Sequence, residues 1–485
     1  MQRPYTVTPC PTARFIVRHA AFASSAAVLL AGLVGCASVP NKGGLPDVQH
    51  DARQRTGMRV EWMQDAQGDS VVSAWVQRTL TAEVPVDTAI QIGLLRNKRL
   101  QASFEDLGIA QADLTQAGLL ANPVLSVGKA FARGGGIGIQ SLGVALPFID
   151  ILQRPLRQRV ATQDFAAARA RMSAAVVNLA AEIRLAYVDA QAALQMLELR
   201  RSVSMAMDAS AIAAAAIHDA GNLSDLDLAR ERAQAADARL DVFTAEADAA
   251  VSRAELERTM GVRGGHAWTL APRLLPPSDT TASAASLLEI ALGRRLDLRA
   301  ARSDANAAAQ RAGLTRAFAL LPDGTIGASY ERDPDGTFWG GTLSIPLPLL
   351  DRGQGRIARN RALLRQAGAR HDALVVEISA EVRQSSAMLA SARAREEHIR
   401  RVVLPLRHQV VMETQKFVNS MENSIFTLLL ARQAEIDAGQ TYIDALRDYW
   451  RTRARLERAV GGTLAPLTAA ERADSVSPER TAPPN

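Results

Sequence analysis

The stretch AIQIGLLR at residues 89–96 decides the fold, because it returns as LLEIALGR at residues 287–294, an offset of 198. Two further pairs keep nearly the same offset: LPFID at 146–150 with LPLLD at 347–351, and ERTMG at 257–261 with ERAVG at 457–461. Three anchors in the same order at nearly constant spacing indicate a duplicated unit of about 175 residues. Two such copies can build a wall that neither could close alone.

A very long helix is predicted in the first copy. Residues 156–220 contain neither proline nor glycine, and as one helix they would span about 97 Å. Positions spaced four and three apart form an apolar seam of the coiled-coil kind, namely Leu179, Ile183, Ala186, Ala190, Leu194 and Leu197. Gly221 is the natural turn, and residues 226–260 are expected to run back antiparallel.

The second copy repeats this pattern from Gly355 to Val460. Pro405 interrupts it, and we expect a kink or a break there because proline lacks the N–H that a helix uses.

Each copy also contains two short stretches of about ten residues, the length that a tilted strand needs to cross a bilayer. They are residues 124–133 and 137–146 around a Gly-Gly-Gly turn, and residues 325–332 and 337–345 around Asp-Pro-Asp-Gly. In the second hairpin Ile326, Ala328 and Tyr330 alternate with small or polar residues. One apolar and one small or polar face is typical of a barrel strand between lipid and water. A hairpin on a soluble domain would look similar.

The N-terminus has the pattern of a processing segment. Arginines at 3, 14 and 18 precede a short apolar run over 20–35, which is too short for a spanning helix. The ending LVGC at 33–36 resembles the lipobox of bacterial lipoproteins. That resemblance implies removal of residues 1–35 and a covalent lipid on Cys36, and Ala37-Ser38 favours the outer membrane. An ordinary signal peptide with a chance cysteine is the alternative.

Composition excludes several classes of function. The net charge of +6 includes three signal arginines, so there is no nucleic-acid footprint. Cys10 would leave with the signal, so no disulfide is expected. The sequence has no phosphate loop, no GxSxG and no HExxH, and its histidines do not pair as metal ligands. We therefore predict no catalytic residue, no metal site and no cofactor beyond the lipid, and Met205 and Met207 are read as packing residues rather than cargo ligands.

The order of these elements resembles the outer-membrane efflux (TolC) family over residues 85–462. The motifs that carry the resemblance are LPF with Asp150, IPLP with DRG at 345–353, EIRLAY at 182–187, GNLS at 221–224 followed by LDLA at 226–229, and VLP at 403–405. It implies a mainly α fold with a small β part: a duplicated unit of long antiparallel helical hairpins, each with one β-hairpin. It also implies a homotrimer, with a 12-helix periplasmic barrel and a 12-strand outer-membrane β-barrel.

The resemblance further implies a function without chemistry. The chain would be the outer-membrane channel of a tripartite efflux system in a Gram-negative bacterium. It would export small molecules or ions from an inner-membrane pump through a periplasmic adaptor protein. The alternative that remains is a non-conducting coiled-coil lipoprotein that scaffolds the envelope.

The expected organisation has six parts. They are a removed signal peptide (1–35), an N-terminal surface segment (36–84), a first repeat (85–262, hairpin 124–147, turn near 221), a linker (263–285), a second repeat (286–462, hairpin 324–346, turn near 422) and a disordered tail (463–485).

The two turns are the candidate sites. The resemblance implies that their residues dock the adaptor, namely Gly221, Asn222, Leu223, Ser224, Glu422, Asn423 and Ser424. It also implies a periplasmic aperture nearby, for which the candidates are Asp225, Asp227, Phe426 and Thr427. Helix-start acids favoured by the helix dipole are the plainer reading of the two aspartates. The second turn departs from the family, since Thr427 and Leu430 occupy positions that are commonly acidic there.

Overall fold

The computed structural model describes residues 38–64, 66–131, 137–265, 267–277, 284–333, 335–422 and 424–464. The signal peptide, Cys36, Asn423 and nearly all of the tail therefore lie outside the described residues. The chain divides into a unit over Met1–Asn41 and a unit that begins at Lys42. The fold below is that of the second unit.

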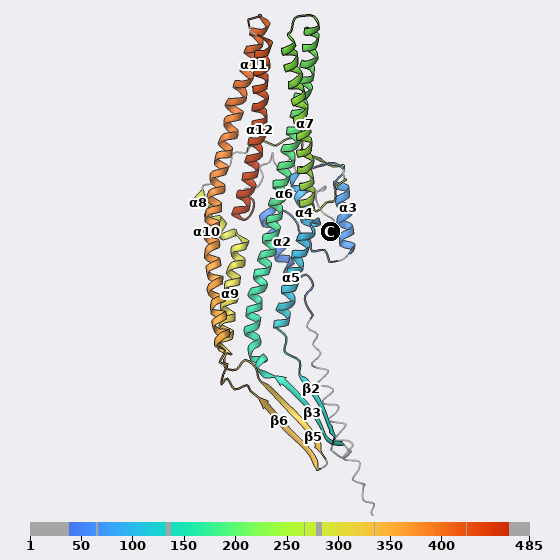
Figure 1. Cartoon of the computed structure of the whole chain (residues 1–485). Coiled ribbons are helices and arrows are strands. Elements are labelled where there is room, and N and C mark those ends of the chain that lie inside the picture. Colours follow the sequence, from blue (N-terminus) through green and yellow to red (C-terminus); the bar gives the residue numbers. More distant parts are fainter. Residues whose placement is uncertain are drawn as a thin grey trace, which may run out of the picture. The chain divides into compact units, whose positions relative to one another are not determined.

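The two copies repeat one order of elements, with two short helices, a β-hairpin, a long helical limb and a returning helix (Figure 1). The first copy consists of α4 (Val86–Arg96), α5 (Lys98–Ala117), β2 (Val124–Phe131), β3 (Ile137–Pro147), α6 (Phe148–Asp219) and α7 (Asp225–Met260). The second consists of α8 (Ala284–Arg294), α9 (Leu296–Ala317), β5 (Thr325–Asp333), β6 (Gly336–Ser344), α10 (Gln354–His398), η1 (Ile399–Val403), α11 (Leu404–Asn419) and α12 (Ile425–Val460). The predicted duplication of helical hairpins and β-hairpins is confirmed.

Helix α6 is longer than the sequence indicated, because it begins at Phe148 and includes Pro155. The extra turns are held by packing, since Ile149 is fully buried. A Cβ on Gly324 would lie only 3.0 Å from the ring of Phe148, so the start of α6 is pressed against the chain that leads into β5. Tertiary contact thus outweighs the helix-breaking tendency of proline near a helix end.

The repeated ERxxG motif has a structural explanation. The returning helix of each copy ends in a left-handed glycine that lies on the break between the two short helices of the same copy. In the first copy Asn97 Nδ2 donates to the carbonyl of Thr259 at 2.8 Å. In the second, Arg295 Nη1 donates to the carbonyl of Ala459 at 3.1 Å. These positions differ by 198 and 200, as the sequence anchors do.

The prediction that residues 36–84 form a surface segment is wrong for its described part. Helices α2 (Leu45–Thr56) and α3 (Ala66–Thr79) contribute side chains to the largest apolar core. Val48 and Ala52 are fully buried, and Trp62 and Trp75 nearly so. The reason is that α2 packs against α6 and α3 against α4, so their apolar side chains share one core with those helices.

The predicted linker is also partly structural. Strand β4 (Thr269–Leu270) pairs in parallel with β1 (Glu83–Val84). Tyr187 secures this pair, because its hydroxyl donates to the carbonyl of Val84 at 2.9 Å and accepts from the backbone N–H of Ala271 at 3.2 Å. Burial raises the pKa of Tyr187 to about 12.

Pro405 is accommodated without a break. The five residues before α11 form a π-helical turn, η1, in which the N–H of Leu404 bonds to the carbonyl of Ile399. Wider hydrogen-bond spacing relieves the backbone around a residue that has no N–H to donate. Proline then occupies the second position of α11, where helices tolerate it.

Candidate functional site: an apolar sheet and two helical turns

The two β-hairpins join into one four-stranded antiparallel sheet of order β2-β3-β5-β6. The central pair, β3 with β5, connects the two copies, and Gln140–Pro147 faces Thr325–Arg332 in continuous register. Strands β2 and β6 form the edges of this sheet.

The register gathers apolar side chains on one face of the sheet. Leu142 stands opposite Val127 and Tyr330, and the next rows follow the same pattern. The face comprises Leu125, Val127, Leu142, Val144, Leu146, Ile326, Ala328, Tyr330, Trp339 and Leu343. Most of these side chains are exposed, with Val127 at 76% and Trp339 at 80%. A single soluble chain would not expose so much contiguous apolar surface.

The opposite face carries mainly small and polar residues. They are Ser126, Gly128, Ser141, Gly143, Gly327, Ser329, Gly340 and Thr342. Ile139 and Phe338 near the hairpin turns, and Val124 at the other end of the sheet, are apolar exceptions. Two faces of such different chemistry are the arrangement of a barrel wall between lipid and water.

The apolar face ends in an aromatic pair next to the hairpin turns. Tyr330 and Trp339 meet edge to face with ring centroids 4.9 Å apart. The next row along the strands is polar and contains Lys129 and Arg332. Aromatic residues between an apolar band and a polar rim are typical of a membrane–water interface.

The first helical turn lies between α6 and α7. Gly221 has a φ of +78°, and a Cβ built on it would meet nothing within 4 Å. The N–H of Asn222 bonds back to the carbonyl of Ile217 at 3.0 Å, which closes the end of α6. The turn is therefore open to a partner on the side of Gly221.

The two acids of this turn differ in environment. Asp227 accepts from the hydroxyl of Ser224 at 2.7 Å and from Arg230 at 3.3 Å, so within one chain it belongs to the N-cap of α7. Asp225 is almost fully exposed and contacts His218 Nε2 at 2.7 Å. Hydrogen bonds to Asp225 and then to Asp219 raise the pKa of His218.

The second helical turn has the same backbone but different chemistry. The N–H of Glu422 bonds to the carbonyl of Phe417 at 2.9 Å, which matches the Asn222–Ile217 bond of the first turn. Met421 takes the place of Gly221, with a φ of +59° that a non-glycine residue adopts at a cost, and its side chain is 95% exposed. Met421 was not among the predicted site residues, although it lies 200 residues after Gly221, at the offset of the duplication.

The aperture candidates of α12 lie in its first turn. The hydroxyl of Thr427 donates to the carbonyl of Ser424 at 2.7 Å. Phe426 follows Ile425 at the start of the helix. The structure thus brings Glu422, Ser424 and Thr427 to one turn, and Gly221 to Asp227 to the other.

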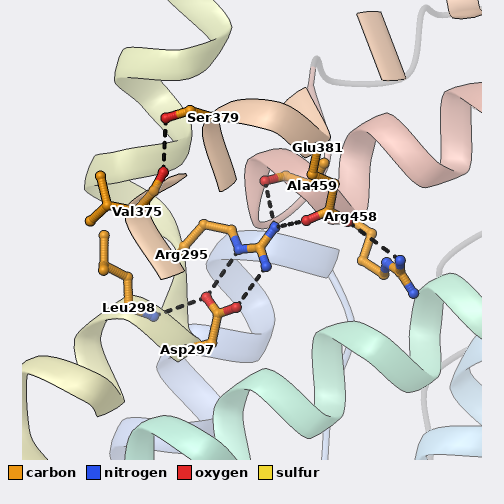
Figure 2. A network of polar contacts seen from close by, with 8 residues as sticks. All are labelled: Arg295, Asp297, Leu298, Val375, Ser379, Glu381, Arg458 and Ala459. Carbon is orange, nitrogen blue, oxygen red and sulfur yellow. Dashed lines mark hydrogen bonds and ion pairs between the residues drawn. The ribbon is translucent and has the colours of Figure 1, made fainter. Parts of the chain in front are cut away.

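A charged network that the sequence did not predict joins the elements of the second copy (Figure 2). Arg295 contacts Asp297 at 2.6 Å and Glu381 of α10 at 2.5 Å, while Arg458 of α12 contacts the same Glu381 at 3.4 Å. Burial alone would lower the pKa of Arg295, but the hydrogen bonds to the two carboxylates outweigh it and raise that pKa. The network holds α9, α10 and α12 together at what we call the glycine junction, where the glycine after the returning helix (Gly261 or Gly461) lies against the break between the two short helices of its copy. It has no free nucleophile or base.

Further pairs connect the two copies. Arg184 of α6 contacts Glu457 of α12 at 2.8 Å, and Arg451 of α12 contacts Asp189 of α6 at 2.6 Å. Asp51 of α2 accepts from Arg299 of α9. These contacts link α6 to α12, and α2 to α9.

Two further features are absent from the described residues. None of their helices has both the length and the hydropathy to span a membrane. They contain no cluster of three or more His, Cys, Asp and Glu side chains placed to hold a metal ion.

Residues 287–462 match the sequence model of a family described as outer membrane efflux protein. No curated protein sequence shows significant similarity to the chain. The backbone resembles solved structures of outer membrane channels at low sequence identity. CmeC of Campylobacter jejuni aligns with a TM-score of 0.67 at 14% identity over 82% of this chain and 89% of its own.

Two other structures show the same backbone similarity. VceC, an outer membrane protein of Vibrio cholerae, aligns with a TM-score of 0.63 at 17% identity over 83% of this chain and 98% of its own. The open state of the MtrE outer membrane channel of Neisseria gonorrhoeae aligns with a TM-score of 0.60 at 18% identity, over 78% of this chain and 89% of its own. At these identities the likeness establishes the fold.

Proposed function

We propose that this chain, whose residues 287–462 match the sequence model of the outer membrane efflux protein family, is the outer-membrane channel of a tripartite exporter. It provides the exit for small molecules or ions that an inner-membrane pump drives through a periplasmic adaptor protein. The observation that carries the proposal is the four-stranded sheet, with an exposed apolar face, a small polar face and an aromatic rim. A scaffold lipoprotein has no use for such a sheet.

The sheet also supports a homotrimer. Strands β2 and β6 leave their outer backbone groups unpaired within one chain, and a bilayer does not tolerate open edges. Three chains supply twelve strands, an even number within the range of bacterial barrels. The long limbs, with α6 alone of 72 residues and hence about 108 Å, supply a twelve-helix tube across the periplasm.

Cys36 anchors the chain to the outer membrane in this proposal. A lipid there would hold the N-terminus at the same membrane that the sheet crosses. Mass spectrometry of membrane-extracted protein tests it: we expect a lipid mass on the first residue after cleavage. A Cys36→Ala protein that still carries the full lipid mass would contradict the assignment.

The helical turns dock the adaptor in this proposal. Gly221 offers an open left-handed position at the first turn, with Asn222, Leu223 and Ser224 beside it. Glu422, Asn423 and Ser424 serve the second turn. Asp225 is the best aperture acid, since it is almost fully exposed, whereas Asp227 is engaged in a helix cap. Phe426 and Thr427 are the candidates from the second copy.

A pair of glycine variants tests the docking assignment. Gly221→Leu should abolish export and leave the trimer intact, because a bulky side chain then occupies the docking surface. Gly57→Leu is the matched control, since Gly57 also has a positive φ of +73° and open space but ends α2. Unchanged export by Gly221→Leu would show that the turn does not dock the partner.

Electron microscopy of the protein in mild detergent separates the channel from the scaffold. Threefold particles with a tube on the order of 100 Å, together with conductance in a planar bilayer, support the channel. Thin rods without a barrel, and no conductance, would favour the non-conducting scaffold.

A further inference from the structure

Apolar side chains are exposed where the sheet meets the helices. The loop between β6 and α10 carries Leu347, Leu349 and Leu350, which are 76%, 74% and 94% exposed. On the other copy, Ile151 and Leu152 in the first turns of α6 are also exposed. Leu347 to Leu350 lie directly after the apolar face of the sheet, so the apolar surface continues past the ends of the strands.

We call the exposed residues Ile151, Leu152, Leu347, Leu349 and Leu350 the apolar rim. Arginines lie on the elements around it. We define the basic collar as Arg154 of α6, Arg316 of α9, Arg352 of the loop, and Arg356 and Arg359 of α10, all of which are exposed. Arg356 donates to the carbonyl of Ala319. Within the described part of the chain, no acidic partner is found for any of the five side chains. Many other arginines of the long helices, by contrast, are paired with acids, as in Arg200–Asp241 and Arg201–Glu246.

Charge is distributed unevenly along the helices. The segments next to the sheet, residues 148–164, 311–323 and 347–366, contain ten arginines and four aspartates. Two of those aspartates are already paired, Asp150 with Arg157 and Asp164 with Arg311. Around the first turn, residues 205–245 contain seven acids and three arginines. The end of each helical limb that adjoins the sheet is therefore basic, and the turn of the first copy is acidic.

We propose that the basic collar binds the phosphate groups of anionic phospholipids in the leaflet on the helical side of the sheet, while the leucines of the rim insert among their acyl chains. This inference rests on the proposed function, because it requires the sheet to lie in a membrane. Arginine suits phosphate, since its planar guanidinium forms paired charge-assisted hydrogen bonds. Apolar residues beside arginines whose heads reach the headgroups are the arrangement of an interfacial anchor.

The distances agree with this placement. Arg154 is six residues from the start of α6 and Arg359 five residues from the start of α10, which corresponds to about 9 Å and 8 Å along the helix axes. The headgroup layer on each side of a bilayer is about 5–8 Å thick. An arginine side chain within that reach can meet a phosphate directly.

A second copy of the chain fits the basic collar less well than anionic lipid does. Every copy brings the same ten arginines to this level, so neighbouring copies in a ring add like charge. A layer of anionic headgroups neutralises it. The collar thus prefers anionic lipids and fixes how deeply the barrel lies in the membrane.

Native mass spectrometry of the full-length protein in mild detergent, titrated with phosphatidylglycerol or with phosphatidylcholine, measures this preference. The test variant replaces Arg316, Arg352 and Arg359 with Gln. The control replaces Arg302, Arg370 and Arg383, which are exposed on the same helices but farther from the sheet. Both variants lose the same charge. The test variant should lose phosphatidylglycerol affinity about fivefold per arginine, and the control should keep it.

Equal phosphatidylglycerol affinities of the test and control variants would refute lipid binding by the collar. So would the absence of any preference of the unaltered protein for phosphatidylglycerol. Full competition by inorganic phosphate would also overturn it, because it would identify a free-anion site. Arg→Lys at the three collar positions keeps the charge but loses the paired hydrogen bonds, so its preference should lie between those of the unaltered protein and the Gln variant. A preference as low as that of the Gln variant would contradict the contribution of charge. Conductance of the unaltered protein is measured in parallel: conductance without lipid preference refutes the collar alone, and failure to insert refutes the proposed function.

Discussion

Gly261 and Gly221 offer a matched test of what the glycine junction contributes. Both are left-handed residues after a long helix, with φ of +69° and +78°. A Cβ on Gly221 would meet open space, whereas a Cβ on Gly261 would lie 2.9 Å from Asn97 Cα and 3.0 Å from the carbonyl oxygen of Arg96. Alanine at the two sites therefore shares one backbone cost and differs in the collision.

The magnitudes follow from these contacts. The left-handed conformation costs alanine about 1–2 kcal/mol, and the lower entropy of the unfolded chain returns about 0.4–1 kcal/mol. Gly221→Ala should thus destabilise its turn by about 1 kcal/mol. Gly261→Ala must also displace Asn97, whose amide donates to Thr259 and whose oxygen caps α5. Losing that bond and that cap adds about 1 kcal/mol each, for a total of about 3 kcal/mol.

Amide hydrogen exchange measures the local stability at both sites in the same protein. The reporters are the N–H of Asn222, bonded to Ile217, and the N–H of Val262, bonded to Glu257. Exchange through local opening scales with the opening free energy. Acceleration should be about fivefold at Asn222 and about 150-fold at Val262. Accelerations within threefold of each other would refute the assignment of Gly261 to a packed junction.

Three further outcomes are expected. Met421→Gly should slow exchange at the second turn, because the gain from relieving a left-handed methionine, about 1–2 kcal/mol, exceeds the entropy cost of glycine; faster exchange would contradict this. The raised pKa of His218 means that its contacts with Asp225 and Asp219 stabilise the first turn fully below about pH 6.5 and progressively less as pH rises through the raised pKa. Protection of that turn should therefore fall between mildly acidic and alkaline pH, and His218→Gln should remove the pH dependence. Tyr187→Phe should lower the free energy of unfolding by about 1–3 kcal/mol, measured by chemical denaturation, since a buried acceptor and a buried donor lose their partner.

The duplicated architecture could be predicted because its signals are local and repeated. Proline- and glycine-free runs, a turn at Gly221 and alternating strands each follow from the preferences of neighbouring residues. The register between β3 and β5 was not predictable, since it joins residues almost 200 positions apart. Only the observed pairing shows that the two hairpins share one apolar face.

For the N-terminal segment, the sequence pattern led to a wrong prediction. Helix α2 is only twelve residues long and strongly polar on average, so its pattern resembles a solvated stretch. What makes it structural is a pair of distant contacts, Asp51 with Arg299 and the packing of Val48 in the core. Two tryptophans, in a chain with five, were the available signal.

At the candidate turns the sequence located the backbone and missed the chemistry. The turn near residue 422 was expected from its polar residues. The left-handed conformation of Met421 in that turn, and the capping role of Asp227 in the first turn, depend on dihedral angles and side-chain geometry. The junction of Asn97 and Arg295 was likewise invisible, since the two residues differ in type although they occupy equivalent positions.

The order of the sheet gives assembly a direction. One edge, β2, comes from the first copy and the other, β6, from the second, and their strands run in opposite senses. Chains that share one orientation and pair antiparallel must therefore join β6 of one chain to β2 of the next, and every incomplete ring still has one edge of each kind. A chain with a proline placed in the middle of β6 would be accepted through its intact β2 edge and would then stop closure. Mixed with normal chains, it should act as a dominant-negative terminator of growing rings.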